Sequence, residues 1–135
     1  MPNALYDKGR EAFLAGEIDW ETDVIKAVLI DAADYTVNLA AHQFLSDIPL
    51  AARVATSAPL TGKTVANGVA DAYDLIFPAV SGDSAEALVI YQDTGAAGTS
   101  RLIAYIDTAT GLPVIPNGGD INVAWDNGAD KIFKL

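Results

Sequence analysis

The chain has 135 residues, 51% of them hydrophobic, and contains no cysteine. This length and composition suit one domain with its own core, and they exclude disorder, disulfides and thiolate metal sites. Acidic residues outnumber basic ones 18 to 8, and the net charge of −10 argues against binding to nucleic acid. No run approaches the ~18 apolar residues of a membrane span, and the N-terminus lacks a signal-peptide pattern, so we expect no membrane partner and no secretory export.

The first 20 residues predict a short helix outside the rest of the chain. Asn3 is a suitable N-cap, and residues 4–15 contain neither proline nor a β-branched residue. Gly16 stands where a helix commonly ends in a left-handed residue. We therefore divide the chain into an N-terminal helix or arm, residues 1–20, and a β-rich domain, residues 21–135.

The β-rich domain begins with residues 24–30, whose β-branched side chains predict a buried strand. Residues 39–45 predict a short helix. Val54 begins a weak strand, and two further strand-like segments accompany the turn-prone pair Asn67-Gly68. These segments are residues 63–69 and residues 73–80.

The clearest pattern is a pair of apolar runs, residues 87–91 and 102–106, joined by a loop of small residues, 93–100. The pair predicts an antiparallel hairpin at the centre of a sheet, covered on both faces.

Three short segments follow the hairpin. The first, residues 112–115, contains a proline and predicts an edge segment. The second, residues 121–125, alternates so that Ile121, Val123 and Trp125 share a face. The third, residues 131–135, predicts a closing strand. The fold class expected is mainly β, an antiparallel β-sandwich or partly open barrel with a short N-terminal helix.

Motifs that could signal chemistry are better explained by structure. Residues 61–64 (TGKT) resemble the end of a phosphate-binding loop, but Ser57 stands where that loop needs glycine, so we interpret them as a turn entering a strand. His42 is the only histidine and has no partners for a catalytic triad or zinc site. We expect no enzymatic activity, no cofactor, no bound metal and no small-molecule substrate.

Acidic turns offer one alternative to that expectation. Asp126, Asn127 and Asp130 form one such turn, and Asp71 and Asp74 form another. Their spacing does not match an EF-hand, and turn chemistry explains them without a metal, although a structural cation stays open.

The candidate binding residues lie in the N-terminal segment. Aromatic and large apolar side chains are enriched in the cores of protein interfaces, and this segment carries several outside the β pattern. They either pack onto the chain's own sandwich or dock onto a neighbouring protein. The residues are Leu5, Tyr6, Phe13, Ile18 and Trp20.

Nearly the whole chain resembles small virion proteins encoded by tailed bacteriophages. The likeness lies in residues 4–16 (ALYDKGREAFLAG), 25–31 (IKAVLID), 102–108 (LIAYIDT), 111–114 (GLPV), 117–120 (NGGD) and 125–128 (WDNG). The resemblance implies a capsid decoration (cement) protein that binds the major capsid protein and copies of itself, with a trimer as the natural guess. It implies synthesis in the cytoplasm of the host bacterium, a final location on the capsid surface, and no active-site residues.

Other functions stay open at this point. A tail or head-tail connector protein fits the same resemblance. A host-surface or carbohydrate-binding module would use the loop 93–100, although this loop has no aromatic side chain for stacking on a sugar. A hydrolase would need a nucleophile and a base, for which the sequence has no motif.

Overall fold

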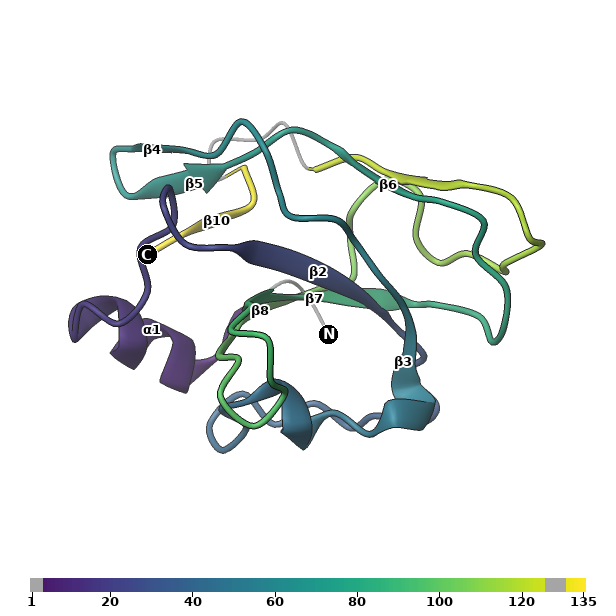
Figure 1. Cartoon of the computed structure of the whole chain (residues 1–135), viewed down its shortest axis with the longest axis horizontal. Helices are drawn as coiled ribbons and strands as arrows, with labels where there is room; N and C mark the ends of the chain where they lie inside the picture. The colour runs from purple at the N-terminus through teal and green to yellow at the C-terminus, as the bar shows by residue number, and fades with distance from the viewer. Residues whose placement is uncertain (1–3, 126–130) are drawn as a thin grey trace.

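The computed structural model describes residues 4–125 and 131–135. Figure 1 shows a mainly β arrangement with one α-helix in these residues. The elements are β1 (Ala4–Leu5), α1 (Asp7–Leu14), β2 (Ile25–Ile30), β3 (Arg53–Thr56), β4 (Thr64–Ala66), β5 (Val69–Asp71), β6 (Leu75–Phe77), β7 (Ala87–Gln92), β8 (Leu102–Ile106), β9 (Ile121–Val123) and β10 (Phe133–Lys134), with 3-10 turns at Leu45–Asp47 and Leu50–Ala52.

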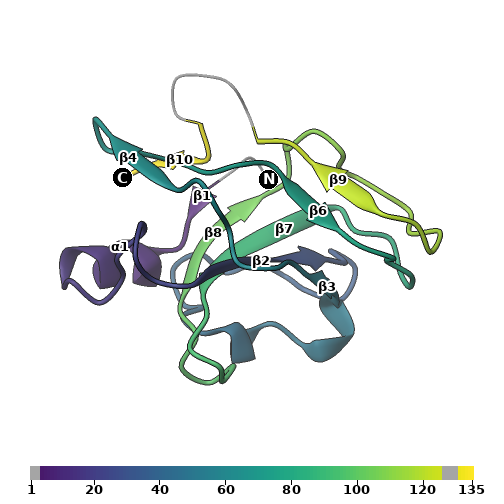
Figure 2. The same ribbon diagram turned by 45° about the horizontal axis from the view of Figure 1, so that its top comes forward.

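The strands form three antiparallel sheets. The main sheet has the order β1-β8-β7-β2-β3, and two smaller sheets have the orders β10-β5-β4 and β6-β9. The smaller sheets lie above the main sheet in Figure 2. The edges of the main sheet, β1 and β3, do not pair with each other, so the sheet is not closed into a barrel. The structure thus confirms the mainly β class. Of the two predicted forms, a sandwich and a partly open barrel, it is sandwich-like.

The central hairpin is confirmed. β7 and β8 pair with Leu88 opposite Ile106 and Val89 opposite Tyr105, and every residue of both strands is buried. Leu88 and Ile90 join the core on the side of the smaller sheets, whereas Val89 packs into a second core with Tyr35 and Ile48 from the segment between β2 and β3. Burial on both faces explains why these strands are continuously apolar.

The predicted helix at residues 39–45 is wrong. Residues 39–41 form a turn, residues 42 and 43 have no regular secondary structure, and Leu45 begins a 3-10 turn, because backbone groups of this segment bind other parts of the fold instead of closing an α-helix. The carbonyl of Leu39 accepts the amide of Asp7, the carbonyl of Gln43 accepts the amide of Leu102, and Phe44 forms an isolated bridge with Arg101.

The turn expected at Asn67-Gly68 is confirmed, and it divides the strand-like segment 63–69 into a hairpin of β4 and β5. Asn67 and Gly68 form its two-residue turn, and both have positive φ, 54° and 79°. That conformation is typical of the tight turns that fit the twist of paired strands, which is why Asn-Gly breaks the segment. The segment 73–80 contains only the three-residue strand β6.

The C-terminal predictions are confirmed where the structure describes them. Ile121, Val123 and Trp125 are all buried, whereas Asn122 between them is exposed. β10 closes the small sheet, whereas residues 112–115 form no strand and Val114 makes only an isolated bridge with Ala85. The Asp-Asn-Gly turn at residues 126–128 lies outside the described residues. The N-cap prediction is wrong, because the helix begins at Asp7 and its N-cap is Tyr6, not Asn3.

The N-terminal segment packs on the chain's own main sheet. Ala4 and Leu5 pair with β8 as a short strand, so the helix begins at Asp7 and not at the predicted residue 4. α1 then lies against β8, where Gly9 allows close approach: a Cβ there would be 2.7 Å from the carbonyl oxygen of Leu102. Residues 4–20 therefore pack on the chain's own sandwich, which is the first of the two arrangements expected for them.

Candidate protein-interaction surface

The five candidate interface residues occupy three environments. Leu5 is buried in the core beneath the smaller sheets. Tyr6 is fully buried on the opposite face of the main sheet. Phe13, Ile18 and Trp20 come together at the end of α1, where Ile18 and Trp20 are 5% and 4% exposed and Phe13 is half-buried. The first two therefore support the chain's own fold, and the other three are the ones near a surface.

Tyr6 belongs to a buried polar chain that fixes the segment between β2 and β3. Its hydroxyl lies 2.8 Å from that of Tyr35, which lies 2.7 Å from Nδ1 of His42. The amide of Asn38 donates to the same Nδ1, so this nitrogen accepts and the Tyr35 hydroxyl donates to it. Burial raises the pKa of Tyr35 to about 12 and raises that of Tyr6 further, so both hydroxyls stay protonated. His42 is thus held in a structural network.

An apolar groove lies between the end of α1 and one face of the small sheet β10-β5-β4. Its volume is about 340 Å³. Trp20 packs edge-on against Phe133 with ring centroids 5.2 Å apart, and Phe13 lies 5.8 Å from the same ring. The residues lining the apolar groove are Phe13, Gly16, Ile18, Asp19, Trp20, Val65, Gly68, Ala70, Phe133 and Leu135.

Large apolar side chains remain exposed at the groove. Val65 is 51% and Leu135 is 54% exposed, and Leu14, next to Phe13 at the end of α1, is 85% exposed. The indole nitrogen of Trp20 already donates to the carbonyl of Asp71 at 3.1 Å, so the ring offers apolar surface. These side chains leave apolar area that a bound partner would remove from water.

One carboxylate, that of Asp19, lines the groove. Asp19 belongs to an acidic segment after α1 that also contains Glu17, Glu21 and Asp23, and the Lys63 ammonium interacts with Asp19 and Asp23. Among the described residues only Glu17 of these forms an ion pair, with Arg101 at 2.7 Å. A hydrogen bond from the Thr22 amide lowers the pKa of Asp19, so that carboxylate is charged at neutral pH.

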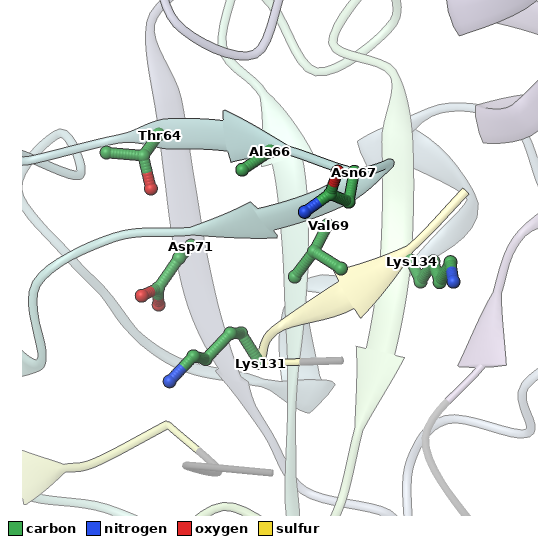
Figure 3. A pocket seen from close by; sticks show the side chains of 7 residues that line it. All are labelled: Thr64, Ala66, Asn67, Val69, Asp71, Lys131 and Lys134. Carbon is green, nitrogen blue, oxygen red and sulfur yellow. The ribbon is translucent and has the colours of Figure 1, made fainter. Parts of the chain in front are cut away.

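The other face of the small sheet forms a polar hollow of about 360 Å³, shown in Figure 3. Strand alternation separates the two faces: Val65 borders the apolar groove, whereas Thr64 and Ala66 line the polar hollow. Lys131 and Lys134 also line the hollow, and neither forms an ion pair with any residue in the described part of the chain.

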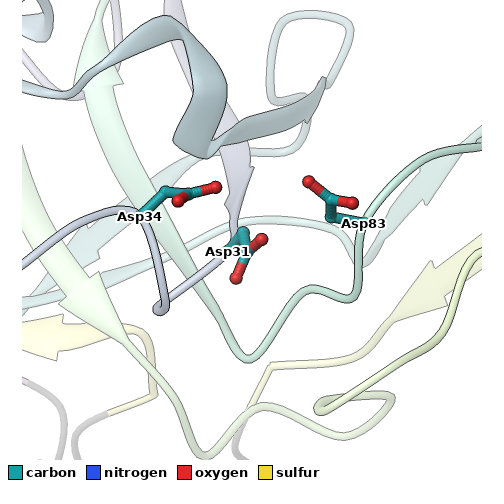
Figure 4. A group of neighbouring side chains, drawn as sticks. All are labelled: Asp31, Asp34 and Asp83. Carbon is teal, nitrogen blue, oxygen red and sulfur yellow. The ribbon is translucent and has the colours of Figure 1, made fainter.

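Three carboxylates meet at the far end of β2, an arrangement that the sequence did not reveal (Figure 4). Asp31, Asp34 and Asp83 each place one oxygen within 4.8 Å of the others. Asp31 is buried and accepts the amide of Ala33 at 3.0 Å, whereas Asp34 and Asp83 are exposed. Acidic clusters are common on a protein of this charge, and this one by itself identifies no ligand.

The acidic turns considered from sequence have ordinary roles where they are described. Asp71 accepts the amide of Ala72, and Asp74 accepts the amide of Trp125, as turn-forming aspartates do. The other predicted turn, with Asp126, Asn127 and Asp130, lies outside the described residues.

The two remaining sequence candidates are held within the fold. Residues 61–64 form a turn entering β4, as interpreted, and the Lys63 ammonium donates to the carbonyl of Asp23. In the loop 93–100, Ser100 donates to the carbonyl of Ala96 and accepts the amide of Thr94. Both features are accounted for by these local contacts.

No family model matches this chain, and no curated protein matches it. Of the residues described, no helix has the length and apolar character needed to cross a membrane.

Proposed function

We propose that this chain is a structural virion protein of a tailed phage, a capsid decoration protein that binds the assembled head shell and stabilises it. The observation that carries the proposal is the apolar groove, which leaves aromatic and aliphatic side chains open to a partner. In this proposal the protein acts by binding and not by catalysis. Its partners are the major capsid protein and further copies of itself, on the outer surface of the capsid.

The fold suits that role. Core packing on both faces of the main sheet gives a rigid body, so little conformational entropy is lost when the groove binds. Net charge far from zero keeps a protein soluble at the high concentration that a multi-copy component reaches. The virion role itself comes from the resemblance to phage proteins, which includes residues 4–16, the segment that contains Phe13.

A binding experiment tests this function directly. Purified chain is mixed with heads from a phage lacking the gene, and the amount that co-sediments is measured. Val65→Ser removes an apolar side chain from the groove. About half of the Val65 side chain is exposed in the free protein and would be buried by the bound shell, so we expect the apparent affinity for heads to fall about five-fold.

Ile115→Ser is the matched control, because Ile115 is 81% exposed and does not line the groove. It should bind heads as the unsubstituted chain does. Binding to isolated tails in place of heads would favour the tail or connector alternative. Equal losses for both variants, or no binding to either structure, would contradict the proposal.

A further inference from the structure

We propose that Asn67 is a site of spontaneous modification: the main-chain nitrogen of Gly68 attacks the side-chain amide of Asn67, which is converted to aspartate or isoaspartate without an enzyme. The inference goes beyond the proposed function and does not depend on it. It concerns the turn between β4 and β5, where Asn67 lines the polar hollow together with Lys131 and Lys134 (Figure 3).

The fold itself selects the reactive pair. Asn67 and Gly68 are the two residues of the hairpin turn, with φ of 54° and 79°. Turns of this kind need positive φ at both positions, and Asn-Gly is among the pairs that adopt it most readily. Glycine also has no side chain that would shield its nitrogen. The pair that best forms the turn is therefore also the pair most open to this reaction.

The reaction needs only water as a co-reactant. The Gly68 nitrogen loses its proton and bonds to Cγ of Asn67, while the bond from Cγ to the side-chain nitrogen breaks and that nitrogen leaves as ammonia. Water then opens the resulting cyclic imide at either of its carbonyls. One opening gives aspartate and the other gives isoaspartate, and each product carries a carboxylate where the amide was neutral.

Hydrogen bonds distinguish this turn from the other Asn-Gly pair that the structure describes. Both pairs are exposed. The Gly118 nitrogen donates to the carbonyl of Val80 at 2.7 Å, and Oδ1 of Asn117 accepts the amide two residues later at 3.0 Å. Within the described part of the chain, no hydrogen bond occupies the Gly68 nitrogen or the Asn67 side chain. The reacting groups are thus engaged at position 117 and available at position 67.

The hairpin of β4 and β5 can also open easily. The ring closes only when Asn67 rotates out of its turn conformation, so the strands must separate briefly. β4 is exposed at all three of its positions and, as an edge strand, pairs only with β5. Segments with little buried surface open locally at a lower free energy than the whole domain. The turn at position 117 is instead held by Val80, which is buried.

A lysine lies beside the attacking nitrogen. A Cβ built on Gly68 would be 3.8 Å from Cγ and 3.9 Å from Cε of Lys134, so the ammonium, one bond further along, lies next to the turn. Lys134 has no ion-pair partner among residues 4–125 and 131–135. Deprotonation of the nitrogen and its attack both create negative charge, which a neighbouring cation stabilises.

Peptide mapping by mass spectrometry provides the test. The full-length chain is incubated at mildly alkaline pH, and its tryptic peptides are followed with time. Residues 64–101 contain Asn67 as their one asparagine, and fragmentation locates Asn117 within residues 102–131. Electron-based fragmentation also separates isoaspartate from aspartate. We expect Asn67 to react at least about five-fold faster than Asn117 in the folded chain, and both to react at similar rates in urea, where neither turn persists.

Three variants test the parts of the argument. Lys134→Gln should slow the reaction of Asn67 about two- to five-fold, the effect of one exposed charge pair. Lys8→Gln makes the same charge change at a lysine that does not line the hollow, and it should leave the rate unchanged. Asn67→Gly keeps a turn-forming pair, because Gly-Gly adopts the same conformation, and should abolish the modification in residues 64–101.

Three results would overturn the inference. These are a reaction of Asn117 as fast as that of Asn67 in the folded chain, a preference for Asn67 that persists unchanged in urea, or equal effects of Lys134→Gln and Lys8→Gln. Because the assay needs no phage particle, its outcome is separate from that of head binding.

Discussion

Replacing Gly9 with alanine should destabilise this protein, although the same change in a solvent-facing helix is stabilising. Glycine in the interior of a helix costs about 0.5–1 kcal/mol relative to alanine, so helix propensity alone predicts a gain. In α1, however, the added Cβ would lie 2.7 Å from the carbonyl oxygen of Leu102 and 3.0 Å from that of Ile103. Both atoms belong to the backbone of the buried strand β8 and cannot rotate away.

The magnitude follows from these two effects. Overpacking typically costs about 1–3 kcal/mol, and subtracting the propensity gain of about 0.5–1 kcal/mol from the middle of that range leaves a net loss of about 1–1.5 kcal/mol in the free energy of unfolding. Urea denaturation followed by circular dichroism measures this loss. Gly98→Ala is the matched control: its Cβ would have no atom within 4 Å, and we expect a gain of about 0.5 kcal/mol. A Gly9→Ala variant as stable as the unsubstituted chain would refute the docking of α1 on β8.

Two further predictions concern polar contacts. Tyr35→Phe should lower the free energy of unfolding by about 2 kcal/mol and Tyr6→Phe by about 1 kcal/mol, because the Tyr35 hydroxyl forms two hydrogen bonds, with Tyr6 and with His42, whereas the Tyr6 hydroxyl forms one of them. Equal losses in urea denaturation would contradict this hydrogen-bond order. The Lys26 ammonium, 2.8 Å from Asp93, lowers the pKa of that carboxyl, and the carboxylate raises the pKa of Lys26. The pair therefore stabilises the fold by about 0.5 kcal/mol at neutral pH. That contribution should be lost as pH falls below about 4, through the pKa of folded Asp93, and as it rises above about 10.5, through that of folded Lys26. Denaturation of Asp93→Asn across pH measures it; a difference from the unsubstituted chain that is constant with pH would argue against the pair.

The strands that could be predicted are those whose amino-acid composition reflects their burial. Residues 87–91 and 102–106 are apolar at every position because both faces of the main sheet are covered, and no other arrangement accommodates such runs as easily. Alternation at Ile121, Val123 and Trp125 was equally informative, because that strand has one buried face.

The errors arose where long-range contacts outweigh local propensity. Residues 39–45 have an acceptable helical composition, but their carbonyls bind Asp7 and Leu102, which are distant in sequence. Ala4 and Leu5 likewise pair with β8 although their neighbours favour helix. Such competition depends on the position of the whole sheet and cannot be obtained from a local window.

The candidate surface was predictable only in part. Phe13, Ile18 and Trp20 were identified by residue type, and all three line the groove. The other half of the groove comes from Val65 and Phe133, which reach it through the pairing of β10 with β5 and of β5 with β4. No sequence signal joins these segments, because the small sheet that unites them is built from strands of two and three residues.

The copy number in purified virions tests the central proposal most directly. Quantitative mass spectrometry of purified particles of a tailed phage whose genome encodes this chain gives the ratio of this chain to the major capsid protein. A decoration protein should be present in numbers comparable with the shell subunit. Absence from mature particles, or a few copies per particle, would contradict that role.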